Sequence, residues 1–452
     1  MPTAATILSF EEARHLVEEH AATLRPRGKE LVDLLDSLGQ ILAEPVLADR
    51  NFPAFPRATR DGYAVCAADL AILPATLEVV AEIKAGAVAD ASLKIEPRQA
   101  AAIMTGAPAP QGCDAVVMVE YTSQDGDQVT ITKGVAAGDN IVPIAAEAKK
   151  GERLLSPGVR LDHAAIAVAA SAGRSRLLVY SKPRVTVLAT GDELVDIDVP
   201  LAPNQIRNSN TYSLAAQIQA AGGEPILLPI APDEPERLRE LIAEGFEADL
   251  LLLTGGVSMG KYDLVEQVLA QFEAEFFFTG TQIQPGRPAV FGRAPCAADI
   301  SAREADRHAS MGFEKNASSG GHGSSTSDKN PRGAPAAPES HKYFFGLPGN
   351  PVSTMVTFEL FARPVLEALA GMAPRKLVFL HAKLKSEIKT KPGLKRFLPA
   401  TLSGEFEQSE VELVRWQGSG DIASTARANC YIVIPPDRER IAPGEWVPIL
   451  MR

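Results

Sequence analysis

The chain has 452 residues, of which 46% are hydrophobic and 22% charged, a composition typical of a soluble globular protein with two to four domains. Its net charge of −11 argues against nucleic acid as a partner, because a phosphate backbone needs a basic surface. No run of 18 apolar residues and no signal-peptide pattern is present, so we expect a cytoplasmic protein without a membrane segment. The four cysteines form no CxxC pair, which gives no support to a zinc ribbon or a disulfide framework.

The first segment, 1–48, indicates a helical or linking domain that residues 149–178 complete. Ser9 and Glu12 have the spacing of a capping box and predict a helix that starts at Phe10. We expect a second helix over "GKELVDLLDSLG", ending at Gly39, and a third over "LDHAAIAVAASAG".

Residues 49–148 indicate a small β-domain inserted into this helical region. The segment begins with a proline-rich loop, "FPAFPRATRDGYAV". Short stretches of strand character follow, among them "TLEVVAEI", "DAVVMVE" and "QVTITK", separated by turn residues.

Residues 179–372 alternate strand and helix patterns, which predicts βαβ units and a parallel sheet covered on both faces. A segment rich in Gly, Ser, Pro and Ala, about 296–341, interrupts the pattern and is interpreted as a flexible insertion. Residues 373–452 again show strand patterns and predict a C-terminal β-domain.

Three loops of the α/β region fall at predicted carboxyl ends of strands, where open α/β sheets bind ligands: "TGDEL", "TGGVSMGKYD" and "GLPGNPVS". Glycines let main-chain N–H groups approach an anion, and Asn350 with Pro351 is a typical helix start. Acids at Asp192, Glu193 and Asp263 are suited to orienting a divalent cation or a water molecule beside such an anion. Together the loops predict an anion cradle, although each alone is equally typical of a tight turn.

Other nucleotide sites are disfavoured by the sequence. No GxGxxG opens the first βα unit and no GxxxxGK[ST] is present, so an NAD or sugar-nucleotide enzyme on a Rossmann-like sheet lacks its phosphate motif.

Seven motifs occur in the order and spacing of a known family: "DGYAV", "MTGAP", "ATGDEL", "TGGVSMGKYD", "QPGRPAVFG", "LPGNPVS" and "QGSGDIASTARAN". On these the chain resembles the MoeA family, the molybdopterin molybdenumtransferases related to the gephyrin E domain. The resemblance covers nearly the whole chain except the segment near 296–341.

The resemblance implies four domains, a homodimer, a central three-layer α/β domain of the MoaB/Mog-like molybdopterin-binding type and a C-terminal β-barrel-like domain. It implies insertion of molybdate into adenylylated molybdopterin, with Mg²⁺ required and AMP released. The active site would lie between the α/β domain of one subunit and the inserted β-domain of the other. A molybdopterin adenylyltransferase and molybdoenzyme chaperones are possible partners.

The motifs carry the family's site residues onto this chain. Residues matched to catalytic positions or expected to act with them are Asp61, Thr105, Glu193, Asp233 and Asp263. We expect substrate contacts from Gly255, Gly256, Ser258, Lys261, Arg287, Pro348, Gly349, Asn350, Pro351 and Ser353, and metal contacts from Asp192, Glu193 and Asp263.

Several positions depart from the family pattern. Arg60 stands where methionine is usual, Lys261 where an acid is usual, and "KPGKP" has become "QPGRP" with Gln284 and Arg287. Glu147 falls near a motif that usually reads "RGED". These changes redistribute charge around the anion site, so an alternative stays open: a catalytically weak paralogue that binds molybdopterin as a scaffold or carrier.

Overall fold

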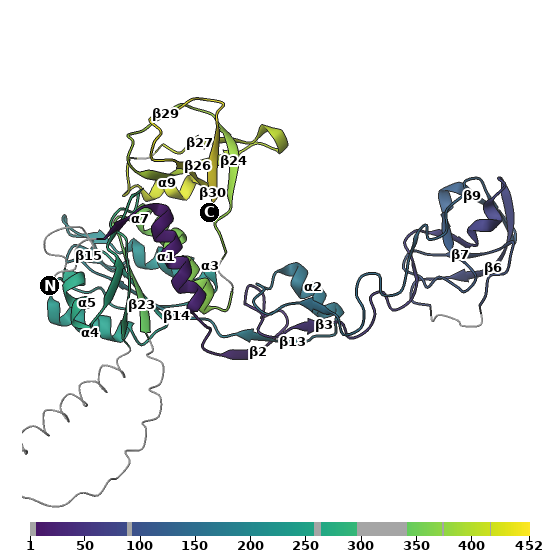
Figure 1. Ribbon diagram of the computed structural model, residues 1–452, viewed down its shortest axis with the longest axis horizontal. Coiled ribbons are helices and arrows are strands. Elements are labelled where there is room, and N and C mark those ends of the chain that lie inside the picture. The colour runs from purple at the N-terminus through teal and green to yellow at the C-terminus, as the bar shows by residue number, and fades with distance from the viewer. Residues whose placement is uncertain (1–5, 88–92, 257–263, 296–340, 373–374, 416) are drawn as a thin grey trace, which may run out of the picture. The chain divides into compact units, whose positions relative to one another are not determined.

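The computed structural model describes residues 6–87, 93–256, 264–295, 341–372, 375–415 and 417–452. The chain divides into two compact units, one of Met1–Glu30 with Tyr180–Arg452 and one of Leu31–Val179 (Figure 1). All but the last residue of the expected insertion at 296–341 lies outside the described residues.

The first unit opens with helix α1 (Phe10–Thr23), and its predicted capping box is confirmed. The Ser9 side chain accepts from the Glu12 N–H, and the Glu12 carboxylate accepts from the Ser9 N–H at 2.9 Å. One face of the helix is apolar and buried, with Phe10, Ala13 and Val17 in the same core as the central sheet.

The central sheet of the first unit has six strands in the order β17 (Glu224–Leu227), β14 (Arg184–Ala189), β18 (Leu250–Thr254), β23 (His341–Leu347), β22 (Val290–Pro295) and β19 (Glu275–Phe278). The first four are parallel, as predicted. β22 is antiparallel to both of its neighbours, which corrects the expectation of a wholly parallel sheet. Only 279–289 separate β19 from β22, fewer residues than a helical crossover needs.

Helices cover both faces of this sheet, as predicted. Along β18, Leu250 and Leu252 belong to one buried core, whereas Leu251 and Leu253 belong to another, because successive strand residues point to opposite faces. The first core includes α3 (Ser209–Ala221), α7 (Pro351–Thr357), a π-helical segment (Phe358–Ala362) and α8 (Arg363–Leu369), and the second includes α4 (Pro235–Gly245) and α5 (Leu264–Gln271).

The C-terminal region forms the β-barrel that was expected. Its closed ring runs β26 (Lys395–Ser403), β27 (Glu410–Leu413), β24 (Phe379–Leu384), β30 (Trp446–Met451) and β28 (Cys430–Ile434), and β28 pairs back to β26. Two short pairings join neighbouring parts of this unit: β1 (Ile7–Leu8) with β20 (Gly280–Thr281), and β21 (Ile283–Gln284) with β26. Helix α9 (Ile422–Arg427) precedes β28.

The second unit contains the inserted β-domain. Its six-stranded sheet has the order β8 (Ala115–Met118), β5 (Gly62–Val65), β7 (Gln99–Ile103), β6 (Ala75–Ile83), β10 (Gln128–Ile131) and β9 (Thr122–Asp125). Helix α2 (His163–Ser171) confirms the helix expected over "LDHAAIAVAASAG". The remaining short strands of this unit are β3 (Val46–Leu47), β4 (Arg57–Ala58), β11 (Ile141–Val142) and β12 (Arg153–Leu155). Those of the first unit are β15 (Leu194–Val195), β16 (Ile206–Arg207), β25 (Ile388–Lys389) and β29 (Arg440–Ile441).

The helix predicted over "GKELVDLLDSLG" is wrong. Lys29–Asp33 form strand β2, which pairs with β13 (Arg176–Tyr180). Val32 and Leu34 both pack against the local core, two residues apart, which is the period of a strand. Pairing with a distant strand overrides the local helical pattern here.

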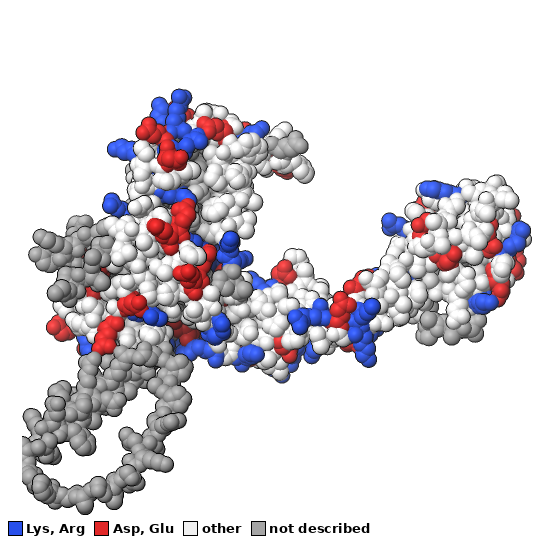
Figure 2. Space-filling model, viewed as in Figure 1, with Lys and Arg blue, Asp and Glu red and all other residues white. Residues whose placement is uncertain are grey.

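Among the described residues, no helix is long and apolar enough to cross a membrane. Acidic and basic side chains are interspersed over the face of the molecule shown in Figure 2.

Candidate active site at the carboxyl edge of the sheet

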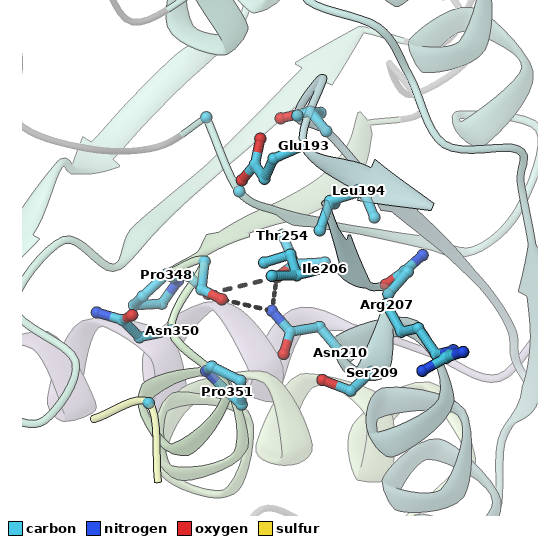
Figure 3. Close-up of a pocket in the computed structure, with 18 of the residues that line it drawn as sticks. Glu193, Leu194, Ile206, Arg207, Ser209, Asn210, Thr254, Pro348, Asn350 and Pro351 are labelled. Carbon is cyan, nitrogen blue, oxygen red and sulfur yellow. Dashed lines mark hydrogen bonds between the residues drawn. The ribbon is translucent and has the colours of Figure 1, made fainter. Parts of the chain in front are cut away.

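A cavity of about 670 Å³ lies at the carboxyl ends of β14, β18 and β23, where two of the three predicted loops and the described part of the third come together. Its walls combine the glycine turn after β18, the acidic loop after β14 and the proline turn after β23 (Figure 3). Of the predicted site residues, the cavity is lined by Glu193, Asp233, Gly255, Gly256, Pro348, Gly349, Asn350 and Pro351.

The turn after β18 requires glycine. Gly255 and Gly256 have φ of +89° and +61°, a region that other residues rarely adopt. A Cβ on Gly255 would lie 2.4 Å from the Thr190 carbonyl oxygen, so the two loops touch through their main chains. The rest of this motif, with the predicted Ser258, Lys261 and Asp263, lies outside the described residues.

Three carboxylates gather beside the acidic loop. Asp192 accepts a hydrogen bond from the Asp233 N–H at 3.1 Å. The carboxylate of Glu193 folds back over Gly191, where a Cβ would lie 2.6 Å from its Oε2. Burial, followed by the charges of Asp192 and Glu193, raises the pKa of Asp233. The acids are therefore close enough to repel one another, although Asp192 itself does not line the cavity.

Asn210, at the start of α3, was not among the predicted site residues. Its Nδ2 donates to the Gly349 carbonyl oxygen at 2.7 Å and to Thr254 Oγ1 at 2.9 Å (Figure 3). Its buried Oδ1 has no hydrogen-bond partner in the described part of the chain. The signal available in the sequence was "NSN" before a helix, which equally suits a helix cap, and Asn208 does cap α3.

The helix after the proline turn offers fewer free N–H groups than expected. Pro351 has none, and the Val352 and Thr354 N–H groups donate to the carbonyl oxygens of Ser419 and Asn350, both at 3.0 Å. Asn350 is the N-cap, but its side chain makes no capping hydrogen bond.

Two other predicted substrate-binding residues do not line the cavity. Ser353 is buried inside α7, and Arg287 is exposed, whereas its neighbour Pro288 does line the cavity. The geometry therefore gives these two residues no direct contact with the cavity.

The barrel supplies a wall that the sequence did not predict residue by residue. Gly420 and Ile422 line the cavity, and Asp421 between them caps α9 by accepting from the Ser424 N–H at 3.0 Å. These residues belong to "QGSGDIASTARAN", which marked the family but indicated no role for any single residue.

Asp61 and Thr105 lie in the second unit. Asp61 Oδ1 accepts from the Thr105 N–H at 2.6 Å, and this hydrogen bond holds the pKa of Asp61 below its usual range. Asp61 borders a separate cavity of about 700 Å³ with walls that are mainly apolar. Glu147 forms an exposed ion pair with Arg57 at 3.0 Å.

The acidic loop fits Mg²⁺ only in part. The described residues contain no group of three side chains arranged to hold a metal ion. Mg²⁺ commonly takes one or two carboxylates and completes its shell with water and substrate phosphate. Burial and then the charges of Asp192 and Glu193 raise the pKa of Asp233, and a bound cation would relieve the repulsion between these charges. Glu193 and Asp233 therefore fit such a shell when the substrate supplies oxygen ligands.

Models of known families match three consecutive parts of the chain. These are "MoeA N-terminal region (domain I and II)" over residues 8–173, "Probable molybdopterin binding domain" over 186–368, and "MoeA C-terminal region (domain IV)" over 381–451.

Full-length relatives agree with these matches. The chain is 34% identical to the molybdopterin molybdenumtransferase of a Nostoc species, covering 93% of this chain and 88% of the relative. It is 31% identical to the protein of that name from Bacillus subtilis, covering 93% and 89%. A solved molybdopterin biosynthesis MoeA protein from Pyrococcus horikoshii superposes with a TM-score of 0.71 at 26% identity, covering 99% of this chain and 100% of the other. The chain belongs to the MoeA family of molybdopterin molybdenumtransferases.

Proposed function

We propose that this protein is a molybdopterin molybdenumtransferase of molybdenum cofactor biosynthesis, and that it inserts molybdate into adenylylated molybdopterin with release of AMP. The observation that carries the proposal is the shared cavity. Glycine turns, a proline turn and two carboxylates meet there in a chain whose relatives bear this enzyme's name.

The cavity has the properties that such a substrate needs. Its volume of about 670 Å³ lies within the usual range for small-molecule sites. Gly255 and Gly256 bring main-chain groups close enough to contact phosphate or pterin, and the wall from Pro348 to Pro351 faces the same space. We assign Glu193 and Asp233 to orienting water at the phosphoanhydride, because they are the carboxylates that line the cavity among the residues that the structure describes.

We propose that Mg²⁺ binds beside Glu193 and Asp233, with Asp192 and Asp263 as further candidate ligands. Bound there, the ion would neutralise charge on substrate phosphates. Asp61 and Thr105 are proposed to act on molybdate from the partner subunit of a homodimer, as the family resemblance implies. A cytoplasmic location stays a prediction of the sequence pattern. Docking of a molybdopterin adenylyltransferase or of molybdoenzyme chaperones stays a prediction of the resemblance.

The decisive assay measures AMP release from adenylylated molybdopterin with molybdate and Mg²⁺, with reactions lacking either ion as controls. We expect AMP release that depends on both, and activation of a molybdoenzyme apoprotein by the product. Tungstate in place of molybdate tests the choice of oxyanion.

The scaffold alternative predicts a different result. Tight molybdopterin binding without AMP release would contradict the enzymatic proposal and support a carrier, the alternative that Arg60, Lys261 and the altered "RGED" motif near Glu147 favour. Restoration of molybdoenzyme activity in a strain that lacks its own molybdenumtransferase separates the two proposals in cells.

A further inference from the structure

A second cavity, of about 290 Å³, lies where α1 and α8 meet barrel strands β28 and β30. None of the residues that line it belongs to the lining of the first cavity. Five of its side chains are basic, namely Arg14, Arg363, Arg375, Lys376 and Arg452, and two are acidic, namely Glu359 and Glu367.

The two acids do not neutralise this cluster. Arg363 pairs with Glu359 at 2.7 Å and with Glu367 at 3.0 Å, and Arg375 shares Glu367 at 2.9 Å. Lys376 and Arg452 have no carboxylate partner among the described residues, and the Arg452 guanidinium donates only to main-chain carbonyl oxygens there. Arg14 also pairs with Glu18 at 2.7 Å, so three acids oppose the five basic side chains and an excess of two positive charges remains.

The base of the cavity is built from buried polar groups. Arg14 is only 7% exposed, and its guanidinium donates to the Leu360 carbonyl oxygen at 2.5 Å and to the Arg375 carbonyl oxygen at 3.2 Å. Leu360 lies in the π-helical segment Phe358–Ala362, a type of turn that is rare and is frequently found at functional sites. The buried Arg14 side chain is therefore fixed at the base of the cavity by hydrogen bonds to main-chain carbonyl oxygens.

Tyr431 is a further polar residue of the cavity, and its hydroxyl is available to a ligand. It lines the cavity and is only 2% exposed, yet its hydroxyl has no hydrogen-bond partner in the part of the chain described. Tyr431 borders the cavity together with Arg452 and Glu359. Burial raises the pKa of Tyr431 to about 12, so the hydroxyl keeps its proton and is a donor. The Tyr431 hydroxyl is not among the enclosed polar atoms that lack a partner, so it is open to the cavity and can donate to a ligand there.

The size of the cavity and its apolar side exclude a bare oxyanion as the best occupant. Leu377, Val378 and Leu450 form an apolar wall beside the cations. We propose that this cavity binds a small organic phosphate monoester. Tyr431 and Lys376 contact the phosphate together with Arg452, and the organic part packs on Leu377 and Val378. A dianion matches the excess of positive charge better than a single carboxylate does.

The test uses phenyl phosphate, which joins a phosphate monoester to an apolar ring, in calorimetric titrations of the full-length protein at low ionic strength. Benzoate and inorganic phosphate are titrated in parallel. Tyr431→Phe removes only the unpartnered hydroxyl, and Lys376→Gln removes an exposed cation, so both variants are expected to fold. Lys391→Gln is the matched control, because Lys391 is exposed and lies outside the cavity.

We expect phenyl phosphate to bind more tightly than benzoate or inorganic phosphate. Loss of one hydrogen bond to a charged group should weaken it about tenfold in Tyr431→Phe. Lys376→Gln should weaken it as well and Lys391→Gln should not, and crystals soaked with phenyl phosphate should show it beside Tyr431. Equal affinity in wild type and Tyr431→Phe, equal binding of benzoate, or occupancy of the first cavity alone would overturn the proposal.

Discussion

The Asn210 side-chain amide donates to the Gly349 carbonyl oxygen at 2.7 Å and so connects the start of α3 to the proline turn before α7. The same nitrogen donates to Thr254 Oγ1 at the end of β18. One side-chain amide thereby fixes the positions of two of the three predicted ligand loops relative to each other.

Replacing Asn210 with alanine should loosen both loops. The buried Thr254 Oγ1 and the exposed Gly349 carbonyl oxygen lose their donor, and we expect the free energy of unfolding to fall by about 1–3 kcal/mol. AMP release should fall with it, because the cavity walls are no longer fixed. Chemical denaturation and the AMP assay check this, with Asn204→Ala at an exposed loop position as the control. Unchanged stability in Asn210→Ala would show that the two hydrogen bonds contribute little.

Gly255→Ala should be more damaging than an ordinary substitution at positive φ. Gly444 also has positive φ, +84°, but a Cβ there meets nothing within 4 Å, so Gly444→Ala measures backbone strain alone, about 1–2 kcal/mol. At Gly255 the clash with the Thr190 carbonyl oxygen adds to that strain. Thermal denaturation of the two variants should place Gly255→Ala well below Gly444→Ala, and equal melting temperatures would contradict the close approach of the loops.

Asp233→Asn should make the protein more stable near neutral pH while lowering its activity. The folded-state pKa of Asp233 is raised, so its contribution to stability is fully present below the unfolded pKa and is lost as pH rises through the folded pKa. Asparagine avoids that loss. Because the side chain is exposed and its charge is screened, the gain at pH 7 should be about half a kcal/mol and should vanish at low pH. Denaturation curves of both proteins from pH 3 to 8 measure the difference, and a constant gain at every pH would exclude ionisation of Asp233 as its cause.

Glu193→Gln should cut AMP release sharply and raise the Mg²⁺ concentration needed for half-maximal rate, while the melting temperature stays nearly unchanged. The carboxylate is exposed at the cavity wall and packs over Gly191, so its loss removes charge rather than core packing. Glu234→Gln is a suitable control, since Glu234 is an exposed carboxylate before α4 that does not line the cavity and makes no capping hydrogen bond. Unfolding of Glu193→Gln would mean that the acid has a structural role.

Asp61→Asn should reduce turnover about a hundredfold if this carboxylate acts in proton transfer, with little change in melting temperature. The Thr105 N–H lowers the pKa of Asp61, so the carboxylate stays ionised until pH falls below the usual range of an aspartate. Any loss of wild-type activity caused by its protonation should therefore occur only at such low pH. Asp125→Asn, at the exposed end of β9 in the same unit, is the control. Full activity in Asp61→Asn would remove this residue from the mechanism.

The sequence predicted those parts of the fold whose signals are local. The Ser9–Glu12 capping box and the helix over His163–Ser171 depend on neighbours a few residues away, and both are confirmed. The helix prediction over Lys29–Asp33 is wrong because the strand that pairs with this segment is more than 140 residues distant. Such a long-range pairing produces no recognisable pattern in the segment itself.

For the candidate site, too, the sequence predicted the residues that have a local signal and missed those placed by distant contacts. Glycine and proline turns can be recognised from the sequence alone, and on that basis Gly255, Gly256 and Pro348 were predicted as site residues. All three line the cavity. Asn210 and Gly420 acquire their places there only through tertiary contacts that no local pattern records. The motif "QPGRPAVFG" predicted Arg287 as a substrate-binding residue. The motif determines only the turn, however, and the Arg287 side chain does not line the cavity.

The five residues Gly280–Gln284 pair with β1 on one side and with β26 of the barrel on the other. Main-chain hydrogen bonds therefore connect the α/β layer to the barrel, in addition to the hydrophobic core that the two share. Heating should melt them together as a single cooperative block in calorimetry, and amide protons on β21 and β26 should exchange with deuterium at matching rates.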